Sequence, residues 1–232
     1  MSNSQIYVVS AARTAIGSFG GSLRDQPLCH LATHVVGAAL SRSGIPAEAI
    51  GHVVMGNVIP TEPRDAYLSR VAAMDAGIPK ETPAFNVNRL CGSGLQAVIS
   101  AAQAIMLGDT DIAIGGGAES MSRGPYLMPA MRWGARLGDS GVTDYMNGIL
   151  HDPWKRNHMG VTAENVAKRF GITRENRMNW RWRASEEPPM RWLQVTLKNR
   201  LRALKFKHAR QPAFSTRMSM CVVMSPWTNS AA

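Results

Sequence analysis

The fold is decided by the stretch from residue 84 to residue 107, which reads AFNVNRLCGSGLQAVISAAQAIML. Its beginning, 84–88, is a short apolar run after Pro83, which predicts a buried strand. Residues 93–107 form a long apolar run, which predicts a helix. The clearly polar side chains of this run are only Ser93, Gln96, Ser100 and Gln103. Because the helix would be apolar on nearly every side, we expect other elements to surround it.

Strands and helices alternate on both sides of this stretch. Short apolar runs predict strands at 6–9, 52–59 and 111–114. Apolar residues that recur every three or four positions predict helices at 28–40 and 65–75. Such alternation predicts an α/β fold with a mostly parallel sheet and helices on its faces.

Length and composition exclude several classes of protein. With 232 residues, 45% of them hydrophobic, the chain can bury a substantial core, which excludes a disulfide mini-protein and a disordered chain. We expect no membrane span, because no apolar run approaches about 18 to 20 residues. We expect no leader at 1–5, because these residues have no basic segment followed by an apolar one. The expected location is therefore the cytoplasm. Cys29, Cys91 and Cys221 lie at wide, unrelated spacings, so we expect neither a disulfide framework nor a metal site.

Most of the net charge of +10 is located near the end of the chain. Residues 1–176 contain 15 Lys and Arg against 14 Asp and Glu, whereas residues 177–232 contain 11 against 2. Four of the six tryptophans also lie beyond residue 176. The composition therefore changes near residue 177.

The hydrophobic periodicity fades between residues 119 and 158. Methionines, prolines and glycines are frequent there and predict a long irregular excursion, which in a compact domain is usually functional. Helical spacing returns at 162–170, and Thr173 is a candidate N-cap of a further helix.

Cys91 is the strongest candidate for a catalytic residue. It precedes the helix predicted at 93–107, so the unpaired amides and the positive end of that helix would favour its thiolate. The same amides can stabilise a negative oxygen on an acyl group carried by the sulfur. Packing is the alternative, since a lone cysteine in an apolar setting is more often a core residue. For Cys29, on a predicted helix, packing is the stronger interpretation.

Two further features could mark a binding site. The glycines at 115–117 follow a predicted strand, but they lack the spacing and the Lys-Ser/Thr ending of phosphate-binding loops. We interpret them as a tight chain passage. His158, which precedes Met159 and Gly160, could form a polar contact with a ligand or simply be solvated.

Longer motifs in the chain resemble those of the thiolases. The most specific are NRLCGSGLQA at 88–97, GGGAESMS at 115–122 and HMGVTAEN at 158–165. Shorter matches are ARTAIG at 12–17 and GNVI at 56–59. The resemblance runs from about residue 5 to residue 176. Within the family, PTEPRD at 60–65 and HDP at 151–153 are most similar to bacterial biosynthetic β-ketothiolases, which are acetyl-CoA C-acetyltransferases.

The resemblance implies an acyltransferase of fatty acid metabolism, which joins acetyl-CoA to another acyl-CoA or cleaves a 3-ketoacyl-CoA. Cys91 matches the nucleophile that carries the acyl group in a covalent intermediate. The substrates would be coenzyme A thioesters, with no permanently bound cofactor. His158 would lie near the pantetheine arm of coenzyme A and Met159 near the acyl pocket. The complete enzyme would be a homodimer or a homotetramer.

The resemblance also implies a domain organisation. Residues 1–118 would form the N-terminal half of a thiolase-like α/β fold, a mixed sheet with helices on both faces. Residues 119–176 would begin the loop domain that covers coenzyme A. Residues 177–232 would be an irregular tail that forms no domain. The ketoacyl synthases share this fold and a cysteine nucleophile, but the residues around Cys91 favour the thiolases.

The family's second half supplies groups that act together with the nucleophile. These are a Gly-His-Pro histidine that activates it, an Asn-Glu motif, and an acid/base cysteine in a Cys-x-Gly loop. None of them occurs in this sequence, where His208 precedes Ala209 and Cys221 precedes Val222. We therefore expect a truncated chain without thiolase turnover, an inert fragment being the alternative to an enzyme. We also expect exposed apolar surface on the helix at 93–107, and hence aggregation.

Out-of-frame translation accounts for the composition of the tail. Met and Trp have single codons, which fixes part of the nucleotide sequence. When the reading frame is moved back by one base, the codons of 218–224 can encode DEHVRGD, those of 177–184 DELALAS and those of 196–201 FKEQI. All three are similar to thiolase segments. We therefore predict a frameshift, with one nucleotide missing near codon 177. The alternative is a basic module for nucleic acid or anionic membranes, but the tail has no recognisable binding motif, so we expect no specific nucleic acid partner.

Overall fold

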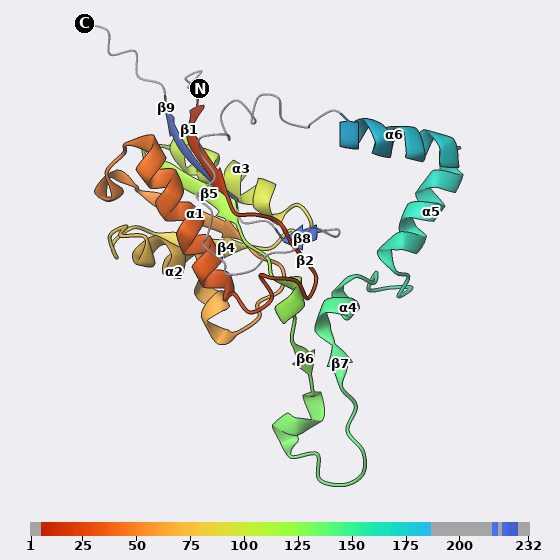
Figure 1. The fold of residues 1–232 in the computed structure, drawn as a ribbon. Coiled ribbons are helices and arrows are strands. Elements are labelled where there is room, and N and C mark those ends of the chain that lie inside the picture. Colours follow the sequence, from red (N-terminus) through yellow and green to blue (C-terminus); the bar gives the residue numbers. More distant parts are fainter. Residues whose placement is uncertain (1–5, 187–214, 218–219, 227–232) are drawn as a thin grey trace, which may run out of the picture. The chain divides into compact units, whose positions relative to one another are not determined.

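The computed structural model describes residues 6–186, 215–217 and 220–226. These residues form two compact units, which are described separately. The described residues of Met1–Gly124 and Leu201–Ala232 belong to the first unit, and those of Pro125–Arg200 to the second. The first unit has the α/β fold that the sequence predicts (Figure 1).

A five-stranded sheet forms the centre of the first unit (Figure 1). Its strands are β1 (Ile6–Arg13), β9 (Met220–Pro226), β5 (Ala113–Gly117), β3 (His52–Gly56) and β4 (Ala84–Val87), in this spatial order. β3 is parallel to β4 and β5, whereas β9 is antiparallel to β1 and β5. The sheet is therefore mixed, as the resemblance to the thiolases implies. The expectation of a mostly parallel sheet from the alternation of elements is wrong, because β9 pairs antiparallel with both of its neighbours. A separate two-stranded sheet joins β2 (Gly17–Ser18) to β8 (Ser215–Arg217).

Helices cover both faces of the sheet, as predicted. α1 (Leu28–Ser43) and α2 (Leu68–Asp75) pack on one face, and α3 (Ser93–Leu107) packs on the other. The short 3-10 helices of this unit are η1 (Ala47–Ala49), η2 (Pro63–Tyr67) and η3 (Met121–Arg123). α3 has the bounds expected from its composition.

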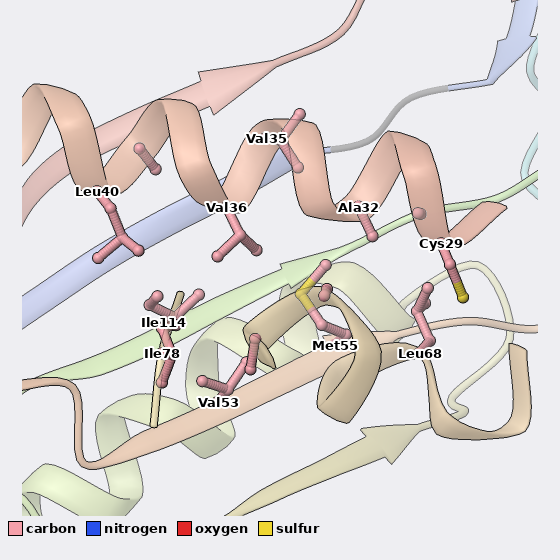
Figure 2. Packing of buried hydrophobic residues seen from close by; sticks show 14 of the residues in the cluster. Cys29, Ala32, Val35, Val36, Leu40, Val53, Met55, Leu68, Ile78 and Ile114 are labelled. Carbon is pink, nitrogen blue, oxygen red and sulfur yellow. The ribbon is translucent and has the colours of Figure 1, made fainter. Parts of the chain in front are cut away.

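The side chains of β3 alternate between two hydrophobic cores. Val53 and Met55 lie in the core under α1 and α2, which Figure 2 shows, and Val54 lies in the core under α3. This alternation is the two-residue period of a strand. β3 therefore fixes the positions of the helices on both faces.

α3 buries only one of its faces. Ala97, Ala101 and Ile105 are buried against the sheet, whereas Leu95 is 68% exposed and Met106 is 67% exposed. The expectation that other elements surround this helix is wrong for the described residues, because the sheet covers it on one side only. The expectation of exposed apolar surface on α3 is confirmed.

One stretch is long and apolar enough to be compared with a membrane span. Leu90–Leu107 has a mean hydropathy of 1.5 over 18 residues, which corrects the expectation that no apolar run reaches this length. Core helices of soluble proteins meet the same criterion, and α3 packs on the sheet of the first unit.

The second unit consists of short strands, two short helices and the longer helices α5 and α6. They are β6 (Tyr126–Leu127), η4 (Pro129–Trp133), β7 (Thr143–Asp144), α4 (Tyr145–Ile149), α5 (Met159–Arg169) and α6 (Arg174–Glu186). The Thr173 hydroxyl accepts a hydrogen bond from the Asn176 N–H at 3.2 Å, as expected for an N-cap. The region from 119 to 158 contains elements, but only short ones.

The tail contains regular structure, contrary to the expectation of an irregular segment. α6 continues to Glu186, and β8 and β9 lie beyond it in the chain. The run MCVVM at 220–224 is apolar and β-branched, so it forms a strand whatever its coding origin, and it pairs with both β1 and β5. The frameshift stays a prediction. The FKEQI comparison falls on residues outside the described ones.

Candidate active site

Cys91 lies in the turn that connects β4 to α3. It is exposed and directly precedes Gly92, the N-cap residue of α3. Leu90, just before it, has a φ of 49°, in the left-handed region that few residues other than glycine adopt. Such conformations persist where neighbouring contacts hold them, and they are concentrated at functional sites.

Ser93 holds the turn from the helix side. Its hydroxyl accepts a hydrogen bond from the Arg89 N–H at 2.8 Å and donates one to the Leu90 carbonyl at 2.6 Å. The Ser93 N–H donates to the same carbonyl at 2.9 Å. From the strand side, the Asn88 Oδ1 accepts from the Leu90 N–H at 2.9 Å. The backbone is therefore bonded on both sides of Cys91.

Glycines allow α3 to rest directly on the strands. A Cβ added to Gly56 would lie 2.6 Å from the carbonyl carbon of Ser93, and one added to Gly115 would lie 2.7 Å from the Cα of Val98. These distances leave no room for a side chain. Gly115 therefore belongs to a tight chain passage, as interpreted from the sequence. Gly56 allows the first turn of α3, which follows Cys91, to lie directly on β3.

Glu119 is a functional candidate that the sequence reasoning did not single out. Two residues after β5, its carboxylate accepts hydrogen bonds from the N–H groups of Val58 at 2.9 Å and Ile59 at 3.1 Å, and from the Asn57 Nδ2 at 3.0 Å. Burial raises the pKa of Glu119 above its ordinary value, and the bonds from Val58 and Ile59 oppose that rise. Only the GGGAESMS motif could have pointed to it.

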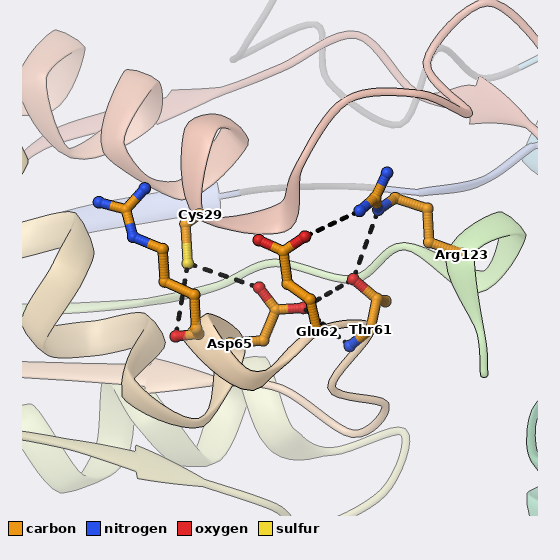
Figure 3. Close-up of polar contacts among 6 residues, drawn as sticks. Cys29, Thr61, Glu62, Asp65 and Arg123 are labelled. Atoms are coloured by element: carbon orange, nitrogen blue, oxygen red, sulfur yellow. Dashed lines mark hydrogen bonds and ion pairs between the residues drawn. The ribbon is translucent and has the colours of Figure 1, made fainter. Parts of the chain in front are cut away.

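Cys29 has the packing role expected of it. It lies on α1 and is fully buried in the core, and its Sγ lies 3.5 Å from the Asp65 Oδ1 (Figure 3). Burial, followed by the neighbouring Asp65 carboxylate, raises the pKa of Cys29 to about 12. The side chain is therefore a neutral thiol and a poor nucleophile at neutral pH.

Asp65 organises the segment that follows β3. Its carboxylate accepts from the N–H and the hydroxyl of Thr61, both at 2.7 Å, and from the Glu62 N–H at 3.2 Å (Figure 3). Glu62 in turn pairs with Arg123 at 2.9 Å. Because Asp65 is fully buried, its contacts are structural and not a binding site.

His158 and Met159 lie at the start of α5, in the second unit. The His158 Nδ1 accepts a hydrogen bond from the Gly160 N–H at 3.0 Å and caps the helix. The His158 ring makes an edge contact with that of His151, with 5.1 Å between the centroids. Met159 is 41% exposed. Their roles toward coenzyme A stay predictions.

An exposed carboxylate shapes the turn that leads to His158. Asp152 accepts hydrogen bonds from the N–H groups of Lys155 and Asn157, each at 2.7 Å, and of Trp154 at 3.1 Å. These bonds, led by the one from Lys155, hold the pKa of Asp152 below its ordinary value.

Comparison with known proteins identifies the class to which this fold and cysteine turn belong. Residues 6–183 match the family model described as the thiolase N-terminal domain. This match covers well over half of the chain, so the chain belongs to the thiolase family. The matched range contains Cys91, Glu119, His158 and Met159.

Curated relatives and solved structures agree with this assignment. The chain is 64% identical to the β-ketothiolase BktB of Cupriavidus necator over 170 residues, which are 73% of this chain and 43% of that protein. It is 48% identical over 172 residues to an acetyl-CoA acetyltransferase of the same organism, again 73% of this chain and 43% of the relative. The chain thus spans less than half the length of these relatives.

The fold agrees with that of solved thiolases. The acetyl-CoA acetyltransferase of Bacillus anthracis superposes with a TM-score of 0.83 at 27% identity, over 96% of this chain and 66% of that one. Human mitochondrial 3-ketoacyl-CoA thiolase in complex with CoA superposes with a TM-score of 0.79 at 30% identity, over 95% of this chain and 64% of that one.

Proposed function

We propose that this chain supplies the N-terminal half of a thiolase-type acyltransferase in which Cys91 carries the acyl group. The observation that carries the proposal is an exposed cysteine in a hydrogen-bonded turn at the start of α3, within the family match. Acetyl-CoA and other acyl-CoA thioesters are the proposed substrates, with no permanently bound cofactor. The proposed setting is the cytoplasm and fatty acid metabolism, with a homodimer or a homotetramer as the complete enzyme.

The proposed first step is a transfer between two sulfur atoms. The Cys91 thiolate attacks the carbonyl carbon of acetyl-CoA, a bond forms to its Sγ, and the bond to the coenzyme A sulfur breaks. The leaving coenzyme A thiolate takes up a proton from solvent or a neighbouring acid. N–H groups at the start of α3 can stabilise the negative oxygen of the tetrahedral intermediate.

We also propose that the chain as it stands performs no complete thiolase cycle. Its sequence contains neither a Gly-His-Pro histidine nor a Cys-x-Gly cysteine to act on Cys91. The test is thiolysis of acetoacetyl-CoA by the purified 232-residue chain, with Cys91→Ala as the control. We expect no turnover above that of the control. Turnover that disappears in Cys91→Ala would contradict this proposal.

The frameshift near codon 177 is proposed on the change in composition and on the three shifted segments. Its test is to sequence the gene from codon 170 past codon 232. An added base that restores QDEL after Asn176 and leads to Gly-His-Pro and Cys-x-Gly motifs would support it. A confirmed 232-residue frame would mean that the product is a truncated thiolase. The absence of codons for Gly-His-Pro and Cys-x-Gly motifs from the shifted frame beyond codon 177 would refute the frameshift.

A further inference from the structure

We propose that the exposed apolar side of α3 is an interface between two copies of this chain, whose α3 helices pack against each other in antiparallel orientation. We define this side by Leu95, Ile99, Ala102 and Met106 and call it the α3 stripe. The inference concerns the 232-residue chain itself and is independent of the role proposed for Cys91.

The α3 stripe has the spacing of a seam between two helices. Its members follow one another at intervals of four, three and four residues, which places them on one side of α3. Leu95 is 68% exposed, Met106 67% and Ile99 39%, whereas Ala102 is half-buried. The opposite side of the helix packs on the sheet. α3 therefore has an exposed apolar surface of the kind that a second helix covers.

The α3 stripe lies in a neutral part of the chain. Residues 93–107 contain no Asp, Glu, Lys, Arg or His. In a symmetric pair both copies contribute the same surface, so any charge in the stripe would be duplicated and buried in the interface. Burial of an unpaired charge is costly, and the stripe avoids that cost. The surface is therefore compatible with a second copy of itself.

Charged residues beyond the two ends of α3 favour the antiparallel orientation. Arg89 is exposed before the helix, and its Nη1 donates to the Gln96 Oε1 at 2.6 Å, so its side chain lies along the first turn of α3. Asp109 and Asp111 are exposed just after the helix. In an antiparallel pair each Arg89 approaches the two aspartates of the other copy, whereas in a parallel pair like charges meet. The dipoles of two neighbouring helices also attract each other only when they are antiparallel.

A lipid surface is the alternative cover for an apolar helix side. Leu90–Leu107 has the hydropathy of a membrane span, but α3 uses one of its sides to pack on the sheet. Asp109 and Asp111 would also meet the negative headgroups of an anionic bilayer. A second copy of the chain instead supplies an arginine opposite them. The charges therefore favour the second copy.

The first test is sedimentation equilibrium of the purified 232-residue chain over a range of concentrations. We expect a reversible equilibrium between monomer and dimer. Leu95→Lys should weaken dimerisation at least about tenfold, because its dimer buries two ammonium groups. The matched control is Met74→Lys, which replaces an exposed apolar residue of α2 on the other face of the sheet and should leave the equilibrium unchanged.

Three outcomes of this test would overturn the proposal. They are a chain that stays monomeric, larger assemblies with no dimer at any concentration, and equal weakening in the two variants. Aggregation that follows the dimer at higher concentration is expected, because Leu107 is 78% exposed and lies outside the α3 stripe.

A pair of complementary variants tests the orientation. In an antiparallel pair the residue at position 95 of one copy meets the residue at position 106 of the other. Met106→Glu should weaken self-association as Leu95→Lys does, and neither change disturbs the core, because both residues are exposed. A heterodimer of the two variants has one lysine–glutamate contact and one unchanged leucine–methionine contact. We therefore expect an equal mixture to associate at least about tenfold more tightly than either variant alone, and no recovery in the mixture would overturn the proposal.

Discussion

The close approach of α3 to the sheet gives the most quantitative prediction. In Gly115→Ala the new Cβ would lie 2.7 Å from the Val98 Cα and 3.0 Å from the Ala97 carbonyl oxygen. Both partners are backbone atoms of α3, so no side chain can rotate away. Restoring an ordinary separation of about 3.5 Å requires the helix to move by roughly 0.7–1 Å. Overpacking of this kind costs about 1–3 kcal/mol, and we expect the upper end of that range.

The assay is equilibrium unfolding in urea, followed by circular dichroism of the helices. With a typical m-value of about 1–3 kcal/mol/M, a loss of about 3 kcal/mol lowers the midpoint urea concentration by roughly 1–3 M. Gly37→Ala is the matched control, because Gly37 lies inside α1 and its added Cβ meets nothing within 4 Å. We expect that control to stabilise the chain by about 0.5–1 kcal/mol. Gly115→Ala with a stability equal to or above that of the parent chain would refute the reasoning.

Three further predictions concern stability and solubility. Asp65→Ala leaves the two backbone N–H groups bonded to Asp65 unsatisfied. We therefore expect the free energy of unfolding in urea to fall by about 1–3 kcal/mol, and a fall below roughly 0.5 kcal/mol would contradict this. Burial raises the pKa of Cys29 from 9.0 to about 12, so its contribution to stability is complete below pH 9 and is lost as pH rises toward 12. Between pH 9 and 12 the free energy of unfolding should fall by about 1.4 kcal/mol per pH unit, and Cys29→Ala should remove this fall. An equal fall in that variant would argue against burial of Cys29 as the cause. On α3, Leu95→Lys should lower aggregation, measured by light scattering, because Leu95 is exposed. Ala97→Lys should instead unfold the chain, because Ala97 is buried. No gain in solubility from Leu95→Lys would show that this face is not the cause of aggregation.

The best sequence prediction was the turn and helix around Cys91. The bounds of α3 follow from local signals, a glycine-flanked start and a continuous apolar run, and the structure places them where expected. The surroundings of α3 were predicted wrongly, because its composition shows only that it is apolar. Composition does not show which of its sides the described residues cover.

Glycine misled the prediction of β5. The sequence predicts a strand at 111–114 that ends at the glycines, whereas β5 is Ala113–Gly117. Glycine is uncommon in strand interiors, and a local signal cannot reveal that α3 lies against Gly115. The strand prefers glycine there because the helix backbone leaves no space for a Cβ.

β9 and Glu119 show two further reasons for failure. β9 is a strand that the expectation of an irregular tail does not contain, although the apolar run at 220–224 alone is sufficient for a strand. Glu119 was not singled out because its partners lie about 60 residues earlier in the chain and form no periodic pattern. A carboxylate that accepts from backbone N–H groups leaves no mark on the sequence around it.

The most direct test of the acyl carrier is to map acetyl groups after incubation with acetyl-CoA. The purified chain is treated with acetyl-CoA at neutral pH, digested at a pH that preserves thioesters, and analysed by mass spectrometry. We predict an acetyl group on Cys91, none on the buried Cys29, and loss of the modified peptide in Cys91→Ala. Acetylation elsewhere with Cys91 unmodified would contradict its role as the residue that accepts the acyl group.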